Sequence, residues 1–198
     1  TVAGIEDVFQ RHLEGADPFQ IELFWRKAYG AGYIARPDVS LVGVISGLEI
    51  AMWDIVGKAV GQPIYNLLGG KTRERLRSYT YLYPESHVKD VDSFWTDADA
   101  HAEQAAHYVE QGFTALKFDP AGPYTIFDPH MPRLDDISRS VEFCKKIREA
   151  VGDKADLLFG THGQFTTGGA IRLAQAIEPF DPLWYEEPTA AETPEEMA

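Results

Sequence analysis

Charged and polar side chains stand at the ends of several apolar segments in this sequence, where they could meet and do chemistry. They are an amine, an imidazole and two carboxylates, from Lys117, His162, Asp119 and Glu186. Such groups together can take a proton from the carbon next to a carboxylate and hold the charge that develops. Because that proton is weakly acidic, the dianionic intermediate needs a cation, which a carboxylate-bound Mg²⁺ would supply.

The segment Leu183–Pro188 predicts a short strand that stops at two adjacent carboxylates. Its apolar and aromatic residues suit a strand covered on both faces, as in a parallel sheet. Pro188 lacks the N–H that strand pairing needs, so the strand ends before it. Glu186 is then placed to bind a hard cation. The alternative is that Glu186 and Glu187 only begin a solvated loop.

Alternation of side chains along a strand groups the remaining candidates. Lys117 and Asp119 fall on one face of their segment, and Gly160 and His162 fall on one face of theirs. In a barrel of alternating strands and helices, the C-terminal strand ends converge on the active site. Taken singly, a strand lysine is more often a surface residue, and a lone histidine is more often a satisfied polar group. Their shared placement favours a catalytic site.

The elements that would position these residues alternate between strands and helices. The expected strands are Arg75–Tyr83, Thr114–Phe118, Asp156–Gly160 and Leu183–Glu186. The expected helices are Val91–Gln111, Leu134–Val151 and Thr167–Ile177. This order indicates parallel βαβ units. With no GxGxxG motif present, it predicts an α/β fold that contains the first four strands of a TIM-type barrel.

The first 70 residues have a different, helical texture. Apolar residues recur at helical spacing in Val2–Leu13, Phe19–Tyr29 and Ser40–Val60, and a short helical turn follows that ends at Gly69 and Gly70. We therefore expect two domains. Residues 1–70 form a helical part, and residues 71–198 form the first half of the barrel.

One predicted loop is too long for an ordinary connection. Residues 121–133 separate a strand from the next helix, where about 2–6 residues are usual. A long loop above a strand end could be a lid or a specificity loop. We therefore expect His130 to contact the substrate. The alternative is an insertion with no functional role.

Composition restricts the possible partners. The net charge of −13 argues against nucleic acid as a partner, because phosphate binding needs basic residues. An anionic substrate would need a local cation. No uninterrupted apolar run reaches about 18 residues, so no membrane partner is expected. Cys144 is the one cysteine, which excludes an internal disulfide and fits a cytoplasmic protein. We expect Cys144 to lie in the core.

A family resemblance is carried by the helix and turn from Ser46 to Gly70. The pattern Trp53-Asp54 … Gly57-Lys58 … Leu68-Gly69-Gly70 resembles the helix that joins the capping domain to the barrel in the enolase superfamily. The mandelate racemase/muconate lactonizing enzyme branch is the most similar. The strands that end near Lys117, His162 and Glu186 follow in the family's order.

The resemblance implies a modified (β/α)₇β barrel after an α+β capping domain, with Mg²⁺ as cofactor and an acid sugar or other carboxylate as substrate. The sugar-acid dehydratase members are the most similar. Lys117 would then neutralise the substrate carboxylate or act as base, and Glu186 would bind Mg²⁺. His162 would be the acid that helps hydroxide leave, while Asp119 would bind a substrate hydroxyl. A homo-oligomer is expected.

The sequence departs from the family's pattern at two positions. The family's Lys-x-Lys pair is Lys117-x-Asp119 here, and the first metal ligand of the family is replaced by Gly160. Two other functions therefore stay open, a racemase or cycloisomerase acting on the same enolate and a barrel without catalysis. We expect this chain to be an inactive piece of a longer protein, with the remaining metal ligand and a His-Asp dyad beyond its end.

Overall fold

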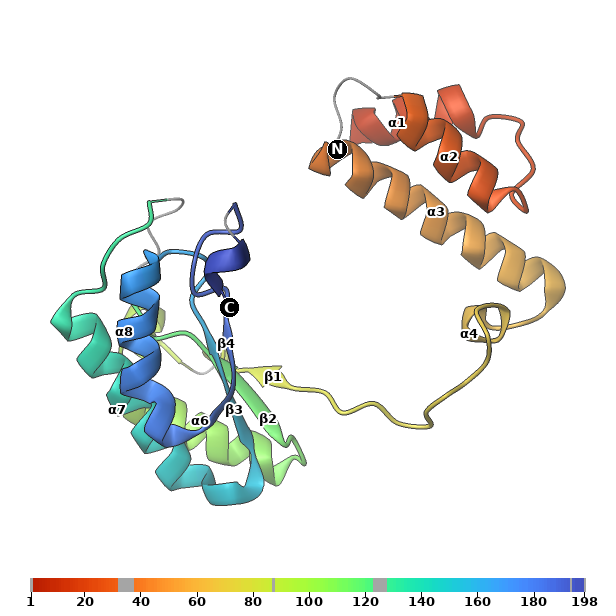
Figure 1. Cartoon of the computed structure of the whole chain (residues 1–198). Helices are drawn as coiled ribbons and strands as arrows, with labels where there is room; N and C mark the ends of the chain where they lie inside the picture. The colour runs from red at the N-terminus through yellow and green to blue at the C-terminus, as the bar shows by residue number, and fades with distance from the viewer. Residues whose placement is uncertain (1, 32–37, 87, 123–127, 193, 198) are drawn as a thin grey trace. The chain divides into compact units, whose positions relative to one another are not determined.

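The computed structural model describes residues 2–31, 38–86, 88–122, 128–192 and 194–197 (Figure 1). The chain divides into two compact units, Thr1–Arg75 and Leu76–Ala198. The expected domain division between residues 70 and 71 remains a prediction.

The first unit is helical. Its helices are α1 (Val2–His12), α2 (Ile21–Ala31), α3 (Val39–Val60) and α4 (Ile64–Leu67). A small core joins α1, α2 and α3 through Val8, Phe24, Ala28, Ile45 and Met52. The α3 helix begins where the Asp38 carboxylate accepts hydrogen bonds from the first turn, and it ends at Gly61, whose φ of 67° suits glycine.

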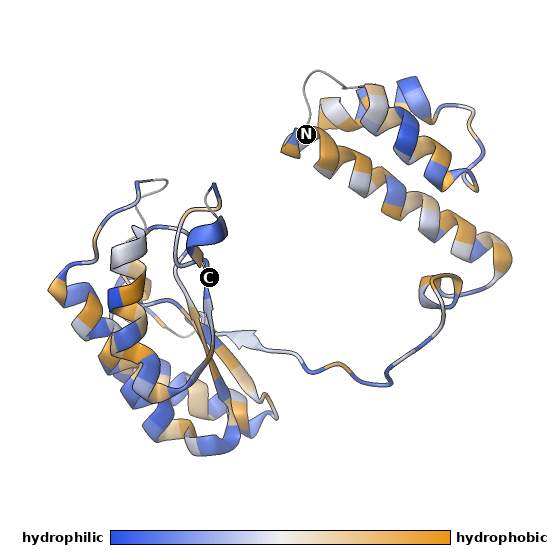
Figure 2. Cartoon of the chain, viewed as in Figure 1, coloured by the Kyte–Doolittle hydropathy of each residue, from blue (hydrophilic) through white to orange (hydrophobic). Residues whose placement is uncertain are grey.

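The α3 helix is unusually long and apolar, as Figure 2 shows. By length and composition alone, its 22 residues could cross a membrane. The core helix of a soluble protein can have the same length and composition, but only part of α3 is buried, with Ile45 and Met52 packed in the small core formed with α1 and α2. An Asp54–Lys58 ion pair lies on the exposed surface of α3. The expectation of no membrane partner therefore stays a prediction.

The second unit is a four-stranded parallel sheet in the order β1-β2-β3-β4. Its strands are β1 (Thr80–Tyr81), β2 (Ala115–Phe118), β3 (Asp156–Gly160) and β4 (Pro182–Glu186). Its helices are α5 (Val91–Phe94), α6 (Ala98–Glu110), α7 (Leu134–Val151) and α8 (Thr167–Ile177). Three short 3₁₀ turns are Gly152–Lys154, Glu178–Phe180 and Pro194–Met197. The α6, α7 and α8 helices cover one side of the sheet (Figure 1).

Strand alternation divides the sheet into a helix-covered face and an opposite face. Leu116, Phe118, Leu157 and Phe159 belong to the core beneath the helices. The intervening side chains, including Lys117, therefore lie on the opposite face. Cys144 is fully buried in α7, as predicted. The predicted order of parallel βαβ units is confirmed, and it is the order of the first strands of a TIM-type barrel.

Three elements differ from the sequence-based expectation. The strand expected at Arg75–Tyr83 is reduced to β1, which pairs only with β2 in the described chain. The helix expected at Val91–Gln111 is divided into α5 and α6, because Asp90 and Asp97 each cap a helix start. The expectation that the fourth strand is covered on both faces is wrong. Leu183 is 53% exposed and Trp184 is 37% exposed, so neither face of β4 is fully covered in the described chain.

Candidate active site

The C-terminal strand ends bring together side chains from all four strands. Tyr81 pairs in register with Lys117, and Gly160 pairs with Glu186. Because all four strands are parallel, the residues that follow them emerge at one edge of the sheet. We call this edge the rim, and define it by Tyr81, Lys117, Asp119, His162 and Glu186.

Lys117 and Glu186 form an ion pair at the rim. The Lys117 Nζ atom lies 2.5 Å from Glu186 Oε1, and the lysine side chain is only 12% exposed. The two residues belong to β2 and β4, so the pair crosses β3. A Cβ atom at Gly160 would lie 3.3 Å from Lys117 Cε. Glycine at this position therefore leaves room for the lysine to reach across.

Asp119 contacts two other members of the rim. The Tyr81 hydroxyl donates a hydrogen bond to Asp119 Oδ1. The His162 Nδ1 atom lies 3.2 Å from Asp119 Oδ2. The Asp119 side chain is only 4% exposed, whereas His162 is 53% exposed. A buried carboxylate thus connects a phenol to an imidazole that solvent can reach.

The backbone around His162 is held in an uncommon conformation. Its φ is 56°, a region that non-glycine residues rarely adopt. The flanking residues hold it there, because the Thr161 hydroxyl and the Gly163 N–H both donate to the Glu187 carbonyl at 2.7 Å. Strain maintained in this way often marks a functional position.

A cavity of about 620 Å³ opens beside the rim. Tyr81, Asp119 and His162 line it. Its other lining residues are Trp95, Thr96, Pro120, Gly122 and Arg139. A cavity of this volume is in the range that small-molecule ligands occupy.

His130 lies in a different environment from the rim residues. In the described chain it does not line the 620 Å³ cavity. Its ring packs edge-on against Phe165 with the ring centroids 5.5 Å apart, and its backbone N–H donates to the Gln164 carbonyl at 3.0 Å. Residues 123–127 of the same loop lie outside the described residues. The substrate contact expected for His130 stays a prediction.

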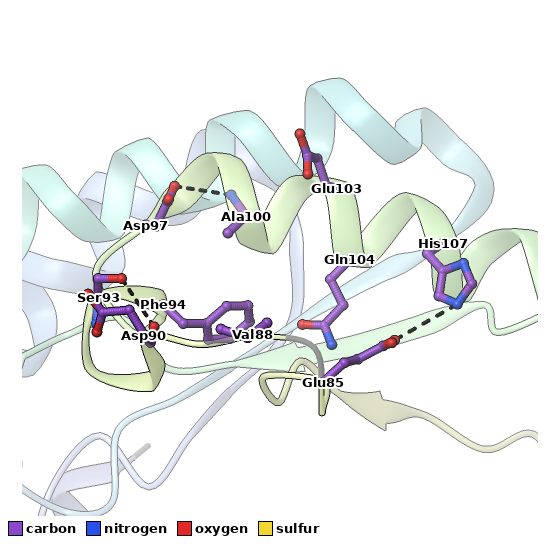
Figure 3. Close-up of a pocket in the computed structure, with 10 residues that line it drawn as sticks. All are labelled: Glu85, Val88, Asp90, Ser93, Phe94, Asp97, Ala100, Glu103, Gln104 and His107. Carbon is purple, nitrogen blue, oxygen red and sulfur yellow. Dashed lines mark hydrogen bonds and ion pairs between the residues drawn. The ribbon is translucent and has the colours of Figure 1, made fainter.

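A second cavity of about 400 Å³ lies beside α5 and α6 (Figure 3). Three of its four lining carboxylates have partners in the fold. Asp90 and Asp97 accept N–H groups at the first turns of α5 and α6. Glu85 lies 3.9 Å from the His107 imidazole. Helix capping explains two of these acids, so we place the candidate active site at the rim.

The rim offers one part of a Mg²⁺ site. Glu186 supplies a carboxylate of the kind that Mg²⁺ prefers, while Gly160 has no side-chain oxygen. Across the ranges described, no three His, Cys, Asp or Glu side chains form a group that could hold a metal ion. Further oxygen ligands would be needed to complete the site.

Sequence reasoning missed three residues of this region, Tyr81, Trp95 and Arg139. Tyr81 could have been found from its place near the end of the first predicted strand. Arg139 lies on α7, where its guanidinium donates to the Pro120 carbonyl and to Asp136. Burial disfavours the ionised form of Asp136, but hydrogen bonds from Arg133 and Arg139 outweigh this and lower its pKa.

Comparison with known families places both parts of the chain. Residues 2–69 match the mandelate racemase/muconate lactonizing enzyme N-terminal domain, and residues 100–198 match the family described as enolase C-terminal domain-like. A mandelate racemase/muconate lactonizing enzyme from Sulfitobacter sp. has a solved structure that is 59% identical, with a TM-score of 0.94. The match covers 99% of this chain and 49% of that one.

Two curated relatives are named sugar-acid dehydratases. The D-gluconate/D-galactonate dehydratase of Picrophilus torridus is 34% identical over 90% of this chain. The D-xylonate dehydratase of Haloferax volcanii is 35% identical over 91% of it. The chain spans 43% of the length of each. The chain belongs to the mandelate racemase/muconate lactonizing enzyme family of the enolase superfamily.

Proposed function

We propose that the complete protein is a sugar-acid dehydratase. It would remove the proton next to the substrate carboxylate and expel the neighbouring hydroxyl group as water, leaving a 2-keto-3-deoxy acid. The observation that carries the proposal is the meeting of Lys117, Asp119, His162 and Glu186 at one rim. The dehydratase relatives support the same reaction.

In this proposal Lys117 neutralises the substrate carboxylate. An ammonium paired with a carboxylate can bind an anionic oxygen, but it has no lone pair with which to take a proton. The 2.5 Å contact between Lys117 and Glu186 therefore favours binding over the alternative role of base. Lys117 is also the local cation that a chain with a net charge of −13 needs in order to attract an acid.

His162 is proposed as the general acid. The C–H bond next to the carboxylate breaks, a base of the complete protein takes the proton, and the electron pair of the bond forms the enediolate. The bond between the β carbon and its hydroxyl oxygen then breaks, and hydroxide takes a proton from the His162 imidazolium to leave as water. The resulting enol tautomerises to the keto acid. The cavity beside His162 has room for the carbon chain of the substrate.

Mg²⁺ in the complete protein is part of the proposal, with Glu186 as one of its ligands. Such an ion, when bound, stabilises the negative charge of an enediolate. A homo-oligomeric, cytoplasmic enzyme remains a prediction.

The test is an assay of the full-length protein with Mg²⁺ on a panel of hexonates, pentonates and hexarates. The expected result is formation of a 2-keto-3-deoxy acid from at least one of them, and its loss in a His162→Gln variant. Exchange of the α proton with solvent deuterium, without loss of water, would instead indicate a racemase or cycloisomerase. If none of the acids shows either deuterium exchange or dehydration, the proposal is contradicted.

A further inference from the structure

Three rim residues form a continuous line of polar contacts. Tyr81 is in β1, and Asp119 and His162 follow β2 and β3, so three neighbouring strands each contribute one group. The Tyr81 hydroxyl donates to one oxygen of Asp119, and His162 Nδ1 lies 3.2 Å from the other. All three side chains line the same cavity.

The carboxylate in the middle is the fixed member of this line. The side chain of Asp119 is 4% exposed, and its two oxygens face different partners. Rotation of the carboxylate would break both contacts at once. A side chain held in this way can orient the group it touches, because its own rotamer is fixed by the partner on its far side.

The glycine on β3 lies directly beside Asp119. A Cβ atom at Gly160 would lie 3.4 Å from Asp119 Cβ and 3.8 Å from Asp119 Oδ2. A longer side chain at position 160 would extend into the space next to the carboxylate. The absence of a side chain on β3 and the placement of Asp119 are therefore parts of one arrangement.

The contacts of the two ring nitrogens of a histidine decide which of them carries the proton in the neutral ring. A carboxylate at Nδ1 favours the form that carries a proton on Nδ1, so that Nε2 is the nitrogen left to exchange a proton with a ligand. The His162 side chain is half exposed, and its φ of 56° sets the direction in which the side chain leaves the backbone, so Asp119 is the contact that can orient the ring.

We propose that Asp119 is a positioning residue for His162, with Tyr81 fixing the carboxylate. This assignment replaces the expectation that Asp119 binds a substrate hydroxyl. It rests on the proposed function only for its effect on catalysis, because the state of the His162 ring can be measured without a substrate.

The experiment is two-bond ¹H–¹⁵N NMR of the full-length protein with ¹⁵N-labelled histidine, in which the His162 signals are identified by their loss in His162→Gln. In the native protein we expect the neutral form of the ring to show the pattern of a proton on Nδ1, whereas the imidazolium of the proposed acid step carries a proton on both nitrogens. Asp119→Asn should shift the ring toward mixed tautomers. Tyr81→Phe should produce a smaller shift in the same direction.

A matched control is Tyr79→Phe. Tyr79 packs on Trp184 at 5.5 Å and does not line the cavity within the described chain. This change should leave the His162 spectrum as it is. Circular dichroism of each variant checks its folding, and Tyr81→Phe tests the inference even where Asp119→Asn fails to fold.

The kinetic part uses whichever acid the protein dehydrates. Asp119→Asn should lower kcat by at least about 10-fold, with KM changed by less than about threefold. A substrate-binding role would instead raise KM. An unchanged His162 spectrum in both Asp119→Asn and Tyr81→Phe overturns the inference. Shifted spectra in a protein that dehydrates no acid support the inference while the dehydratase proposal fails.

Discussion

Lys117 Nζ lies 2.5 Å from Glu186 Oε1, which connects β2 to β4 over the top of β3. The intervening strand presents Gly160 at this point, in register with Glu186. The Lys117–Glu186 contact therefore depends on the absence of a side chain at Gly160 as well as on the two charged residues.

We expect Gly160→Ala to impair the site more than the fold. The added Cβ would lie 3.3 Å from Lys117 Cε, a tight contact that shifts the lysine by a few tenths of an ångström, and 3.4 Å from Asp119 Cβ, an ordinary contact. Activity should fall about 10-fold or more, with little change in melting temperature. Gly43→Ala is the control, because a Cβ there meets nothing within 4 Å. Equal activity of both variants would contradict the prediction.

Lys117→Met should abolish most of the activity. The change removes the cation proposed to meet the substrate carboxylate and leaves Glu186 without this partner. We expect a loss of at least about 100-fold in kcat/KM, measured with the best substrate. The exposed pair Lys58–Asp54 offers a matched control, since Lys58→Met should stay close to native activity and stability. A mild effect at Lys117 would argue against its proposed role.

His101 should make the protein less stable as the pH falls. Burial lowers its pKa to about 4, and its ring packs against Phe94 and Phe143. Below about pH 6.5 the unfolded chain binds a proton that the folded protein does not. This difference in proton binding lowers the free energy of unfolding by roughly 2 kcal/mol between pH 7 and pH 5. The melting temperature of His101→Phe should fall less between pH 7 and pH 5 than that of the native protein. An equal loss in both proteins would contradict this account.

Cys144 should resist thiol reagents in the native protein. It is fully buried in α7, and burial raises the pKa of its thiol to about 12. The reactive thiolate is therefore scarce at neutral pH. Mass spectrometry of the Cys144 peptide after iodoacetamide treatment should show little modification under native conditions and complete modification in denaturant. Rapid native modification would show that this part of α7 opens.

Three elements of the second unit could be predicted from sequence with accurate bounds. Leu134–Val151, Asp156–Gly160 and Thr167–Ile177 begin and end where expected, because pattern, capping and burial agree there. The break between α5 and α6 was missed, although Asp97 is an ordinary helix-capping residue. The hydrophobic side chains of Leu183 and Trp184 suggest burial, but burial depends on which elements pack against a strand, and the sequence pattern does not reveal those elements.

The site could be predicted only in part for a similar reason. Alternation along separate strands predicted that acids and bases would emerge at one edge. It did not predict the Lys117–Glu186 pair or the contact of Tyr81 with Asp119. Both depend on which side chains face each other across strands, and on the room that Gly160 leaves between them.

The loops above the strand ends are themselves joined. Single parallel bridges link His130 to Phe165 and Phe165 to Thr189. The loop that follows β3 is therefore bridged to the loop that follows β2 and to the loop that follows β4. Exchanging any one of these loops with a relative would leave unmatched backbone groups in its neighbours. Engineering of this protein's selectivity should therefore transplant the three segments as a set.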